Sequence, residues 1–331
     1  TTIPAEYILM NHFLGIKEKK LENKLAAYIK KEQNPDGGWP LFWKGKSNIS
    51  TSVKAYFALK LVGENINSKF MVKAKKKILD LGGAENSNVF TKISLAMFGQ
   101  MSWKKIPSMP VEIMSLPNWF PFHINKISYW SRTVVVPLLI ILDKKPLAKN
   151  INKININELF AKNKKTTINY GKDSFFYYYL FIFIDKLLKI SESYFPKKFK
   201  NKSIDKAKVF ILERLNGING LGAIFPAMTN CTIALNLLGQ KKEYKISLNS
   251  VKNLITKKKK YSYCQPCFSP IWDTGLNGLS LLESGLTIND LSIKKACSWL
   301  KKKQILNIKG DWAVKNKKTL PGGWAFQYEN D

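Results

Sequence analysis

The residues Tyr28–Trp39 read YIKKEQNPDGGW, and a related stretch, Trp299–Trp312, reads WLKKKQILNIKGDW. Each stretch has an aromatic–aliphatic pair, three residues, a glutamine, and then a glycine-containing step to a tryptophan. A glutamine at a helix end can satisfy backbone groups that a neighbouring helix leaves unpaired, and glycine allows a tight turn. The unit therefore predicts a clamp between successive helices. Its residues are Gln33 and Trp39 in the first copy and Gln304 and Trp312 in the second.

The segments around this unit alternate between two kinds of predicted helix. Leu21, Leu25 and Ile29 form one apolar stripe at helical spacing, which is typical of an amphipathic helix. Other segments are apolar nearly all round and are expected to be buried; they are 52–63, 88–99, 228–239 and 273–285, and each ends on a glycine. A decayed copy of the unit lies at 210–222. The repeat of helix pairs predicts an all-α fold, an α/α toroid (α6–α6 barrel) rather than an open superhelix.

The length of the chain, 331 residues, favours two domains. A run of four lysines, Lys257–Lys260, suggests where they divide. We expect an N-terminal barrel over residues 1–256 and the beginning of a second barrel over residues 257–331. The segment 144–172 is polar and low in complexity, which predicts a surface loop.

The net charge is +31, from 54 lysines and arginines against 23 acidic residues. Such an excess is typical of proteins that bind nucleic acid or an anionic membrane surface. It is also what a genome rich in A and T produces, because its codons favour Lys, Asn and Ile. Arginine is scarce and no nucleic-acid motif is present, so the sequence does not favour a nucleic-acid partner.

The four cysteines, at 231, 264, 267 and 297, include a single CxxC pair. A structural zinc site needs a second pair of ligands. We therefore predict reduced cysteines in the core and no metal site.

Two apolar runs stand out, TVVVPLLIIL at 133–142 and SFFYYYLFIFI at 174–184. Both are shorter than the roughly 20 residues that a membrane-spanning helix needs. The second run is bounded by charges and is either a buried helix or a patch that dips into one leaflet of a bilayer.

Several longer stretches give the chain a family resemblance. They are WFPFHINKISYWSRTVVVP at 119–137, GLGAIFPAM at 220–228, YCQPCFSPIWDTG at 263–275 and GDWAVK at 310–315. Together with the repeated glutamine–tryptophan unit, they resemble the squalene-hopene and oxidosqualene cyclases, and in particular the bacterial squalene-hopene branch. The resemblance covers the whole chain except the segment 144–172.

The resemblance implies two α/α barrels with the active cavity between them. In this family an aspartic acid of an Asp-x-Asp-Asp motif protonates a terminal alkene of squalene, and ring closures follow until the last cation loses a proton or is trapped by water. That motif is expected just after the stretch 322–331, so the resemblance places no catalytic residue within the chain, and we expect the chain alone to be inactive. No metal and no cofactor are implied.

The resemblance also implies roles for particular residues. Trp130, Trp272 and Phe326 match aromatic residues of the cavity, whose faces would stabilise carbocations without acting as nucleophiles. Phe326 is expected near the acid, and Trp130 at the far end. The residues expected to form the polar or water-holding end are Glu6, Lys54, Lys92, Ile224 and Phe225.

Three of these positions depart from the family pattern. Lys54 replaces an acidic residue, Lys92 an arginine and Phe225 a glutamine. The two lysines could equally face solvent or be paired with acids. The departures concern how water ends the reaction, and therefore the ratio of alcohol to alkene product.

The implied partners are squalene or a similar polyprenyl lipid and one leaflet of a membrane, and a homodimer is a further open prediction. The resemblance places the protein at the cytoplasmic side of a bacterial cytoplasmic membrane. Two alternatives stay open: a cyclase for another polyprenyl substrate, and a non-catalytic helical-repeat protein that binds through its basic surface.

Overall fold

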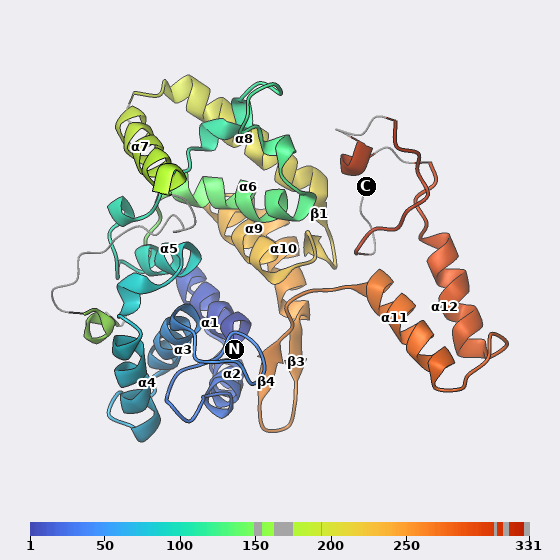
Figure 1. The fold of residues 1–331 in the computed structure, drawn as a ribbon, viewed down its shortest axis with the longest axis horizontal. Coiled ribbons are helices and arrows are strands. Elements are labelled where there is room, and N and C mark those ends of the chain that lie inside the picture. The colour runs from blue at the N-terminus through green and yellow to red at the C-terminus, as the bar shows by residue number, and fades with distance from the viewer. Residues whose placement is uncertain (149–153, 162–174, 193, 308–309, 314–317, 328–331) are drawn as a thin grey trace. The chain divides into compact units, whose positions relative to one another are not determined.

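The structure is a computed structural model that describes the chain except residues 149–153, 162–174, 193, 308–309, 314–317 and 328–331. The described part is mostly helical, with only short strands, so the all-α prediction is confirmed (Figure 1). The α-helices are α1 (Thr2–Leu14), α2 (Lys19–Lys31), α3 (Ile49–Val62), α4 (Lys69–Asp80), α5 (Val89–Met97), α6 (Tyr129–Lys144), α7 (Phe175–Ser191), α8 (Lys197–Arg214), α9 (Phe225–Leu237), α10 (Lys241–Asn253), α11 (Pro270–Glu283) and α12 (Leu291–Lys302). The strands pair as two antiparallel ribbons, β1 (Leu215–Asn216) with β2 (Gly220–Leu221) and β3 (Ile255–Lys257) with β4 (Ser262–Cys264).

The chain forms two compact units, and each unit combines segments that are distant in sequence. Unit 1 comprises residues 1–110, 141–199 and 255–265. Unit 2 comprises residues 111–140, 200–254 and 266–331.

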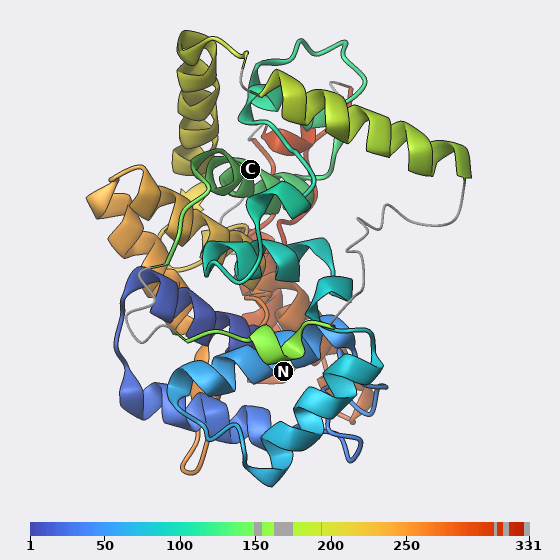
Figure 2. The same cartoon turned by 90° about the vertical axis from the view of Figure 1, so that its left-hand side faces the viewer.

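The centre of unit 1 is α3, which contacts α1, α2, α4 and α5 (blue to cyan in Figures 1 and 2). Asn48 begins the helix by accepting a hydrogen bond from the Thr51 amide at 3.1 Å. Gly63 ends it in the left-handed conformation, at φ 102°. Nearly every residue of α3 is buried, including the large side chains of Tyr56 and Phe57, so the predicted helix that is apolar all round is confirmed.

The first glutamine–tryptophan unit joins three helices of unit 1. The Gln33 side-chain amide donates to the carbonyl of Gly37 at 2.8 Å and to that of Phe70, in the first turn of α4, at 3.0 Å. Trp39 is fully buried, and its indole nitrogen donates to the carbonyl of Ile29 in α2 at 2.7 Å. Its backbone amide donates to the Ser52 hydroxyl in α3 at 2.9 Å. The unit therefore ties the end of α2 to the starts of α3 and α4.

Glycine is required at position 37 by close packing. A Cβ atom there would lie 2.6 Å from the Lys73 backbone of α4, and the residue has φ +93°. Both conditions exclude other side chains. The Gly-Gly-Trp step thus lets the chain pass close to the backbone of α4.

In the second glutamine–tryptophan repeat, the tryptophan that forms the clamp is not the one predicted from the sequence. The Gln304 side chain donates to the carbonyl of Gly322 at 2.7 Å. The indole that donates to the carbonyl of Leu300, at 2.7 Å, belongs to Trp324 and not to Trp312. Leu300 precedes Gln304 by the same four positions by which Ile29 precedes Gln33. The assignment of Trp312 to this role is therefore corrected to Trp324.

The sequence did contain a signal for this correction. Trp324 follows two glycines, as Trp39 does, whereas Trp312 follows Gly310 and Asp311. The spacing from the glutamine favoured Trp312, because the loop between Gln304 and Gly322 is much longer than its counterpart in the first unit. Matching the residues of the turn would have identified the partner better than matching its distance along the chain.

This difference between the two tryptophans can be tested with matched substitutions. Trp324→Phe removes the hydrogen bond from the indole to the Leu300 carbonyl. The neighbouring Ile305 amide donates to the Gly323 carbonyl at 2.9 Å. The protection factor of that amide against hydrogen exchange should fall about fivefold in the variant. Trp312→Phe removes an indole nitrogen that is buried without a hydrogen-bond partner among the described residues, so protection of Ile305 should not fall. Hydrogen exchange measured by NMR or mass spectrometry decides; an equal loss in both variants would contradict the assignment.

The centre of unit 2 is the pair α9 and α10. Thr232 and Ser247 face each other across the pair with their hydroxyl oxygens 2.7 Å apart, and both are fully buried. Cys231 lies in the same interior, where burial raises the pKa of its thiol to about 12. The predicted buried helix at 228–239 is confirmed.

The raised pKa of Cys231 predicts sensitivity to alkaline pH. The folded chain holds the thiol proton up to about pH 12, whereas the unfolded chain releases it from a pKa of 9.0, so stability is lost as pH rises through this window. Between about pH 8 and about pH 10.5 the loss from this group should be about 2 kcal/mol. Cys231→Ala should reduce this pH dependence in urea unfolding, while buried Cys264 and Tyr7, whose pKa values burial also raises, leave a residual slope. An unchanged slope in the variant would contradict the prediction.

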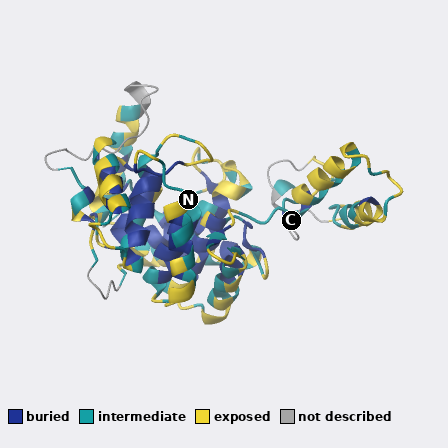
Figure 3. Cartoon of the chain, turned by 90° about the horizontal axis from the view of Figure 1, so that it is seen from below, coloured by how far each residue is buried: buried dark blue, intermediate teal, exposed yellow. Residues whose placement is uncertain are grey.

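Helix α11 differs from its prediction as a buried helix. Only Ile271 of this helix is buried, whereas Trp272, Leu276 and Leu279 are exposed (Figure 3). An apolar helix is buried only if other elements cover it, and within unit 2 the described residues place α12 against α11 along one side. The predicted burial at 273–285 is therefore wrong for this structure.

Two smaller predictions are also corrected. The segment 144–172 is not simply a surface loop: in its described part Ile156 and Leu159 are fully buried, and Glu158 accepts hydrogen bonds from Tyr56 and Lys60. Residues 149–153 and 162–172 of that segment lie outside the described residues. All four cysteines are free; Cys231 and Cys264 are buried as predicted, Cys267 is half-buried, and Cys297 is exposed on α12.

Candidate functional site

Three aromatic side chains of unit 2 come together although they are far apart in sequence. Trp130 lies near the start of α6, Trp272 lies in the first turn of α11, and Phe326 follows the second clamp. The rings of Trp130 and Phe326 meet edge to face with centroids 4.8 Å apart, and those of Trp272 and Phe326 are 6.0 Å apart. Trp130 is 42% exposed and Trp272 59% exposed, so the rings of this aromatic cluster are partly open to their surroundings.

The aromatic cluster can bind hydrocarbon chains and stabilise positive charge. A cation over a tryptophan face gains about 2 kcal/mol when water is excluded, and the ring cannot trap it as a hydroxyl or carboxylate would. The expectation that Trp130 and Phe326 occupy opposite ends of a cavity differs from their direct contact here. Exposed aromatic rings pack against one another where no other apolar surface covers them.

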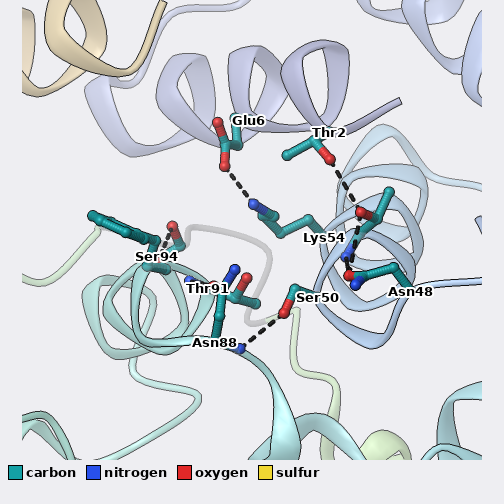
Figure 4. A network of polar contacts seen from close by, with 10 residues as sticks. Thr2, Glu6, Asn48, Ser50, Lys54, Asn88, Thr91 and Ser94 are labelled. Atoms are coloured by element: carbon teal, nitrogen blue, oxygen red, sulfur yellow. Dashed lines mark hydrogen bonds and ion pairs between the residues drawn. The ribbon is translucent and has the colours of Figure 1, made fainter. Parts of the chain in front are cut away.

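The polar residues predicted from the sequence lie in unit 1. Figure 4 shows Lys54 reaching from α3 toward Glu6 on α1, where its ammonium donates to the carboxylate at 2.5 Å. The Lys54 side chain is 6% exposed and that of Glu6 22%. Of the two readings left open by the sequence, the paired one describes Lys54. The negative charge of the Glu6 carboxylate is therefore balanced by the Lys54 ammonium.

Lys92, on α5, is buried as well, so it does not face solvent. Burial lowers the pKa of its ammonium, and the carboxylate of Glu85 partly opposes that shift. A lowered pKa makes the neutral amine less costly to form than it is for an exposed lysine.

Sequence reasoning missed the asparagines that fix the helices around these lysines. Asn48 begins α3, and Asn88 begins α5 by accepting from the Thr91 amide at 2.9 Å (Figure 4). The Asn88 amide also donates to the Ser50 hydroxyl at 2.8 Å, which joins the starts of the two helices. The signal was present, because asparagine before an apolar helical run is a common start of a helix.

Ile224 and Phe225 lie at the start of α9 in unit 2. Ile224 pairs with Cys267 in an isolated antiparallel bridge, and the Phe225 amide donates to the Pro266 carbonyl at 2.8 Å. Phe225 is fully buried and Ile224 half-buried. These backbone bonds fix the stretch 266–268, and hence the start of α11 that carries Trp272.

Among the residues that the structure describes, no cluster of three or more histidine, cysteine or acidic side chains could hold a metal ion. In the same part of the chain, no helix combines the length and the apolar character needed to cross a bilayer.

Comparison with known protein families gives this arrangement its context. The model of the squalene-hopene cyclase N-terminal domain matches residues 1–260, and that of the C-terminal domain matches residues 268–331. The chain belongs to the squalene-hopene cyclase family. The motifs at 119–137 and 220–228, taken above as a resemblance, lie within the first matched region, and the motif at 263–275 enters the second from residue 268. The aromatic cluster joins residues from both matched domains.

Individual squalene-hopene cyclases are similar over the whole chain. The chain is 45% identical to the squalene–hopene cyclase of Zymomonas mobilis over 100% of its length, and 45% identical to that of Bradyrhizobium diazoefficiens over 99%. It is 32% identical to the enzyme of Alicyclobacillus acidocaldarius over 99% of its length. The chain spans about half the length of these curated relatives, namely 52%, 51% and 52%.

Proposed function

We propose that this chain is part of a triterpene cyclase that converts squalene to pentacyclic hopene-type products by protonation and successive ring closures. The observation that carries the proposal is the aromatic cluster of Trp130, Trp272 and Phe326, in which rings from three separate segments meet and stay partly exposed. The reaction needs surfaces that stabilise carbocations without reacting with them, and aromatic faces do so. The names of the similar curated proteins add support.

The division of labour within the protein is part of this proposal. We propose that residues 1–256 form one barrel and that residues 257–331 begin a second. The two family models support this division, because one ends at residue 260 and the other begins at residue 268. The proton donor is proposed to belong to an Asp-x-Asp-Asp motif after Asp331. The role of this chain is then to hold and shape the substrate, and not to start the reaction.

Glu6, Lys54 and Lys92 are proposed to form the polar end of the reaction path. With Glu6 neutralised by Lys54, water there would be oriented by ammonium groups instead of by a carboxylate. Ile224 and Phe225 are proposed to contact the substrate at this same end. These roles bear on whether the last cation loses a proton or takes up water.

The experiment is to incubate the full-length protein with squalene and to identify products by gas chromatography with mass spectrometry. Pentacyclic triterpenes are expected from the full-length protein and none from residues 1–331 alone. Conversion of a different polyprenyl chain but not of squalene would move the substrate assignment to that chain. No conversion of any polyprenyl, with tight salt-sensitive binding to nucleic acid or lipid, would favour the non-catalytic alternative instead.

A membrane surface is proposed as the source of the substrate, and α7 as the contact. Leu180, Phe183, Leu187 and Ile190 recur at helical spacing and are 37%, 59%, 48% and 62% exposed; we call these four residues the α7 stripe. An apolar stripe on a helix too short to span a bilayer is typical of helices that lie in the interface. The alternative of a wholly buried helix is wrong for these side chains.

The opposite side of α7 is anchored to unit 1, which leaves the stripe outward. The Asp185 carboxylate accepts a hydrogen bond from the Ser108 amide at 2.6 Å. Lys189 donates to the carbonyl of Lys104 at 3.2 Å. We propose that the protein sits peripherally on the cytoplasmic side of the bacterial membrane, and a homodimer remains part of the proposal.

A further inference from the structure

The acidic residues of α7 and of the turn that follows it are paired with lysines, so the positive charge available on this surface comes from the lysines that remain. Asp185 forms an ion pair with Lys189 at 2.7 Å, one turn further along the helix. Glu192, just after α7, forms an ion pair with Lys145 at 2.5 Å. Both carboxylates are thus already neutralised by lysines of unit 1, and neither repels an approaching anion.

Exposed lysines lie on α7 and at the start of α8, the next helix along the chain. Lys186 is exposed on α7 itself, between stripe residues Phe183 and Leu187 in sequence. Lys197 and Lys198 are exposed at the start of α8. We call Lys186, Lys197 and Lys198 the lysine rim.

Aromatic residues interleave with the rim beyond the end of α7. Tyr194 is 81% exposed, and Phe199 is also exposed. Aromatic and lysine side chains together are typical of the headgroup level of a membrane, where the ring body contacts acyl chains and the ammonium contacts phosphate. The apolar stripe would then reach the acyl chains while the rim stays among headgroups.

We propose that this surface binds anionic phospholipid selectively, through the lysine rim acting beside the α7 stripe. The inference rests on the proposed docking of α7 at a bilayer and adds to it a choice of headgroup. Each lysine near an anionic membrane strengthens binding about fivefold. A nucleic acid would also attract the lysines, but it offers no acyl region for the four exposed apolar side chains of the stripe.

The test measures sedimentation of the full-length protein with vesicles of phosphatidylcholine and with vesicles that also contain phosphatidylglycerol. Tighter binding to the phosphatidylglycerol vesicles is expected, with the difference shrinking as salt is added. Replacing the rim (Lys186→Gln, Lys197→Gln and Lys198→Gln together) should weaken binding to phosphatidylglycerol vesicles about 100-fold and leave binding to phosphatidylcholine unchanged. The matched control carries Lys241→Gln, Lys242→Gln and Lys245→Gln on α10, three exposed lysines with the same change in net charge, and should bind like the unmodified protein.

The remaining outcomes separate the inference from the docking proposal. Equal binding to both kinds of vesicle, or equal losses in the rim variant and its control, would overturn the headgroup choice but leave docking intact. No binding to either kind of vesicle would overturn both, as would binding to an oligonucleotide in place of vesicles. Leu187→Ser with Ile190→Ser should weaken binding to both vesicle types, which checks the stripe independently of charge. Sedimentation velocity on each variant identifies self-association, and loss of a dimer in the stripe variant without loss of vesicle binding would assign the stripe to a second copy.

Discussion

Trp39→Ala is expected to lower the free energy of unfolding by about 4 kcal/mol. The side chain is fully buried, so its removal leaves a large cavity between α2, α3 and the turn that carries it. The substitution also leaves the Ile29 carbonyl, at the end of α2, without its indole donor. Because Trp39 joins helices that Gln33 links to α4, the loss should appear as destabilisation of unit 1 as a whole. Urea unfolding followed by circular dichroism measures it.

Trp39→Phe serves as the matched control. It keeps most of the buried aromatic volume and removes the hydrogen bond, and it should cost about 1 to 2 kcal/mol. Trp43→Ala is a second control, because the Trp43 side chain is 79% exposed and its loss should be nearly neutral. If Trp39→Ala were no more destabilising than Trp43→Ala, the clamp would not be a stabilising element.

Lys54→Met is expected to lower the free energy of unfolding by about 3 kcal/mol. The substitution keeps the length and apolar stem of the side chain but strands the mostly buried carboxylate of Glu6 without its cation. Removing one member of a buried pair costs more than the pair contributes, since the remaining charge is left unpaired away from water. Lys54→Met combined with Glu6→Leu should recover most of the loss, to within about 1 kcal/mol of the original chain.

A double-mutant cycle over Glu6 and Lys54 tests this prediction by urea unfolding. A large favourable coupling between the two positions is expected, and additive effects would contradict the ion pair. Lys60→Met offers a comparison, because Lys60 pairs with Glu158, and both of these side chains are more exposed than that of Lys54. It should therefore cost less.

The sequence predicts most of the helices, because the spacing of apolar residues indicates where a helix runs and a glycine indicates where it ends. The buried helices expected at 52–63 and 228–239 are present as α3 and α9, and the glycines that close them, Gly63 and Gly239, adopt the left-handed conformation. Apolar periodicity and glycine positions depend only on the local sequence, so they predict these helices even when it is not known which helices pack together.

What the sequence could not predict depends on contacts between distant segments. Apolar residues on α11 read as buried, yet burial requires a covering element, and sequence periodicity does not say where that element lies. Trp312 read as the clamp because spacing was matched, whereas the hydrogen bond to Leu300 comes from Trp324 after a longer loop. In the candidate site, the convergence of Trp130 with Phe326 and the pairing of Lys54 with Glu6 are likewise long-range facts.

The two clamps also say something about how chain length can change in this fold. Six positions separate Gln33 from Trp39, and twenty separate Gln304 from Trp324, yet both tryptophans bond to the carbonyl four residues before the glutamine. Closing the longer loop costs only about 1 kcal/mol more in chain entropy. The segment between glutamine and tryptophan is therefore a position where residues can be inserted while the helices keep their register. It offers a place to graft a recognition peptide or a fluorescent label without disturbing the packing of the helices.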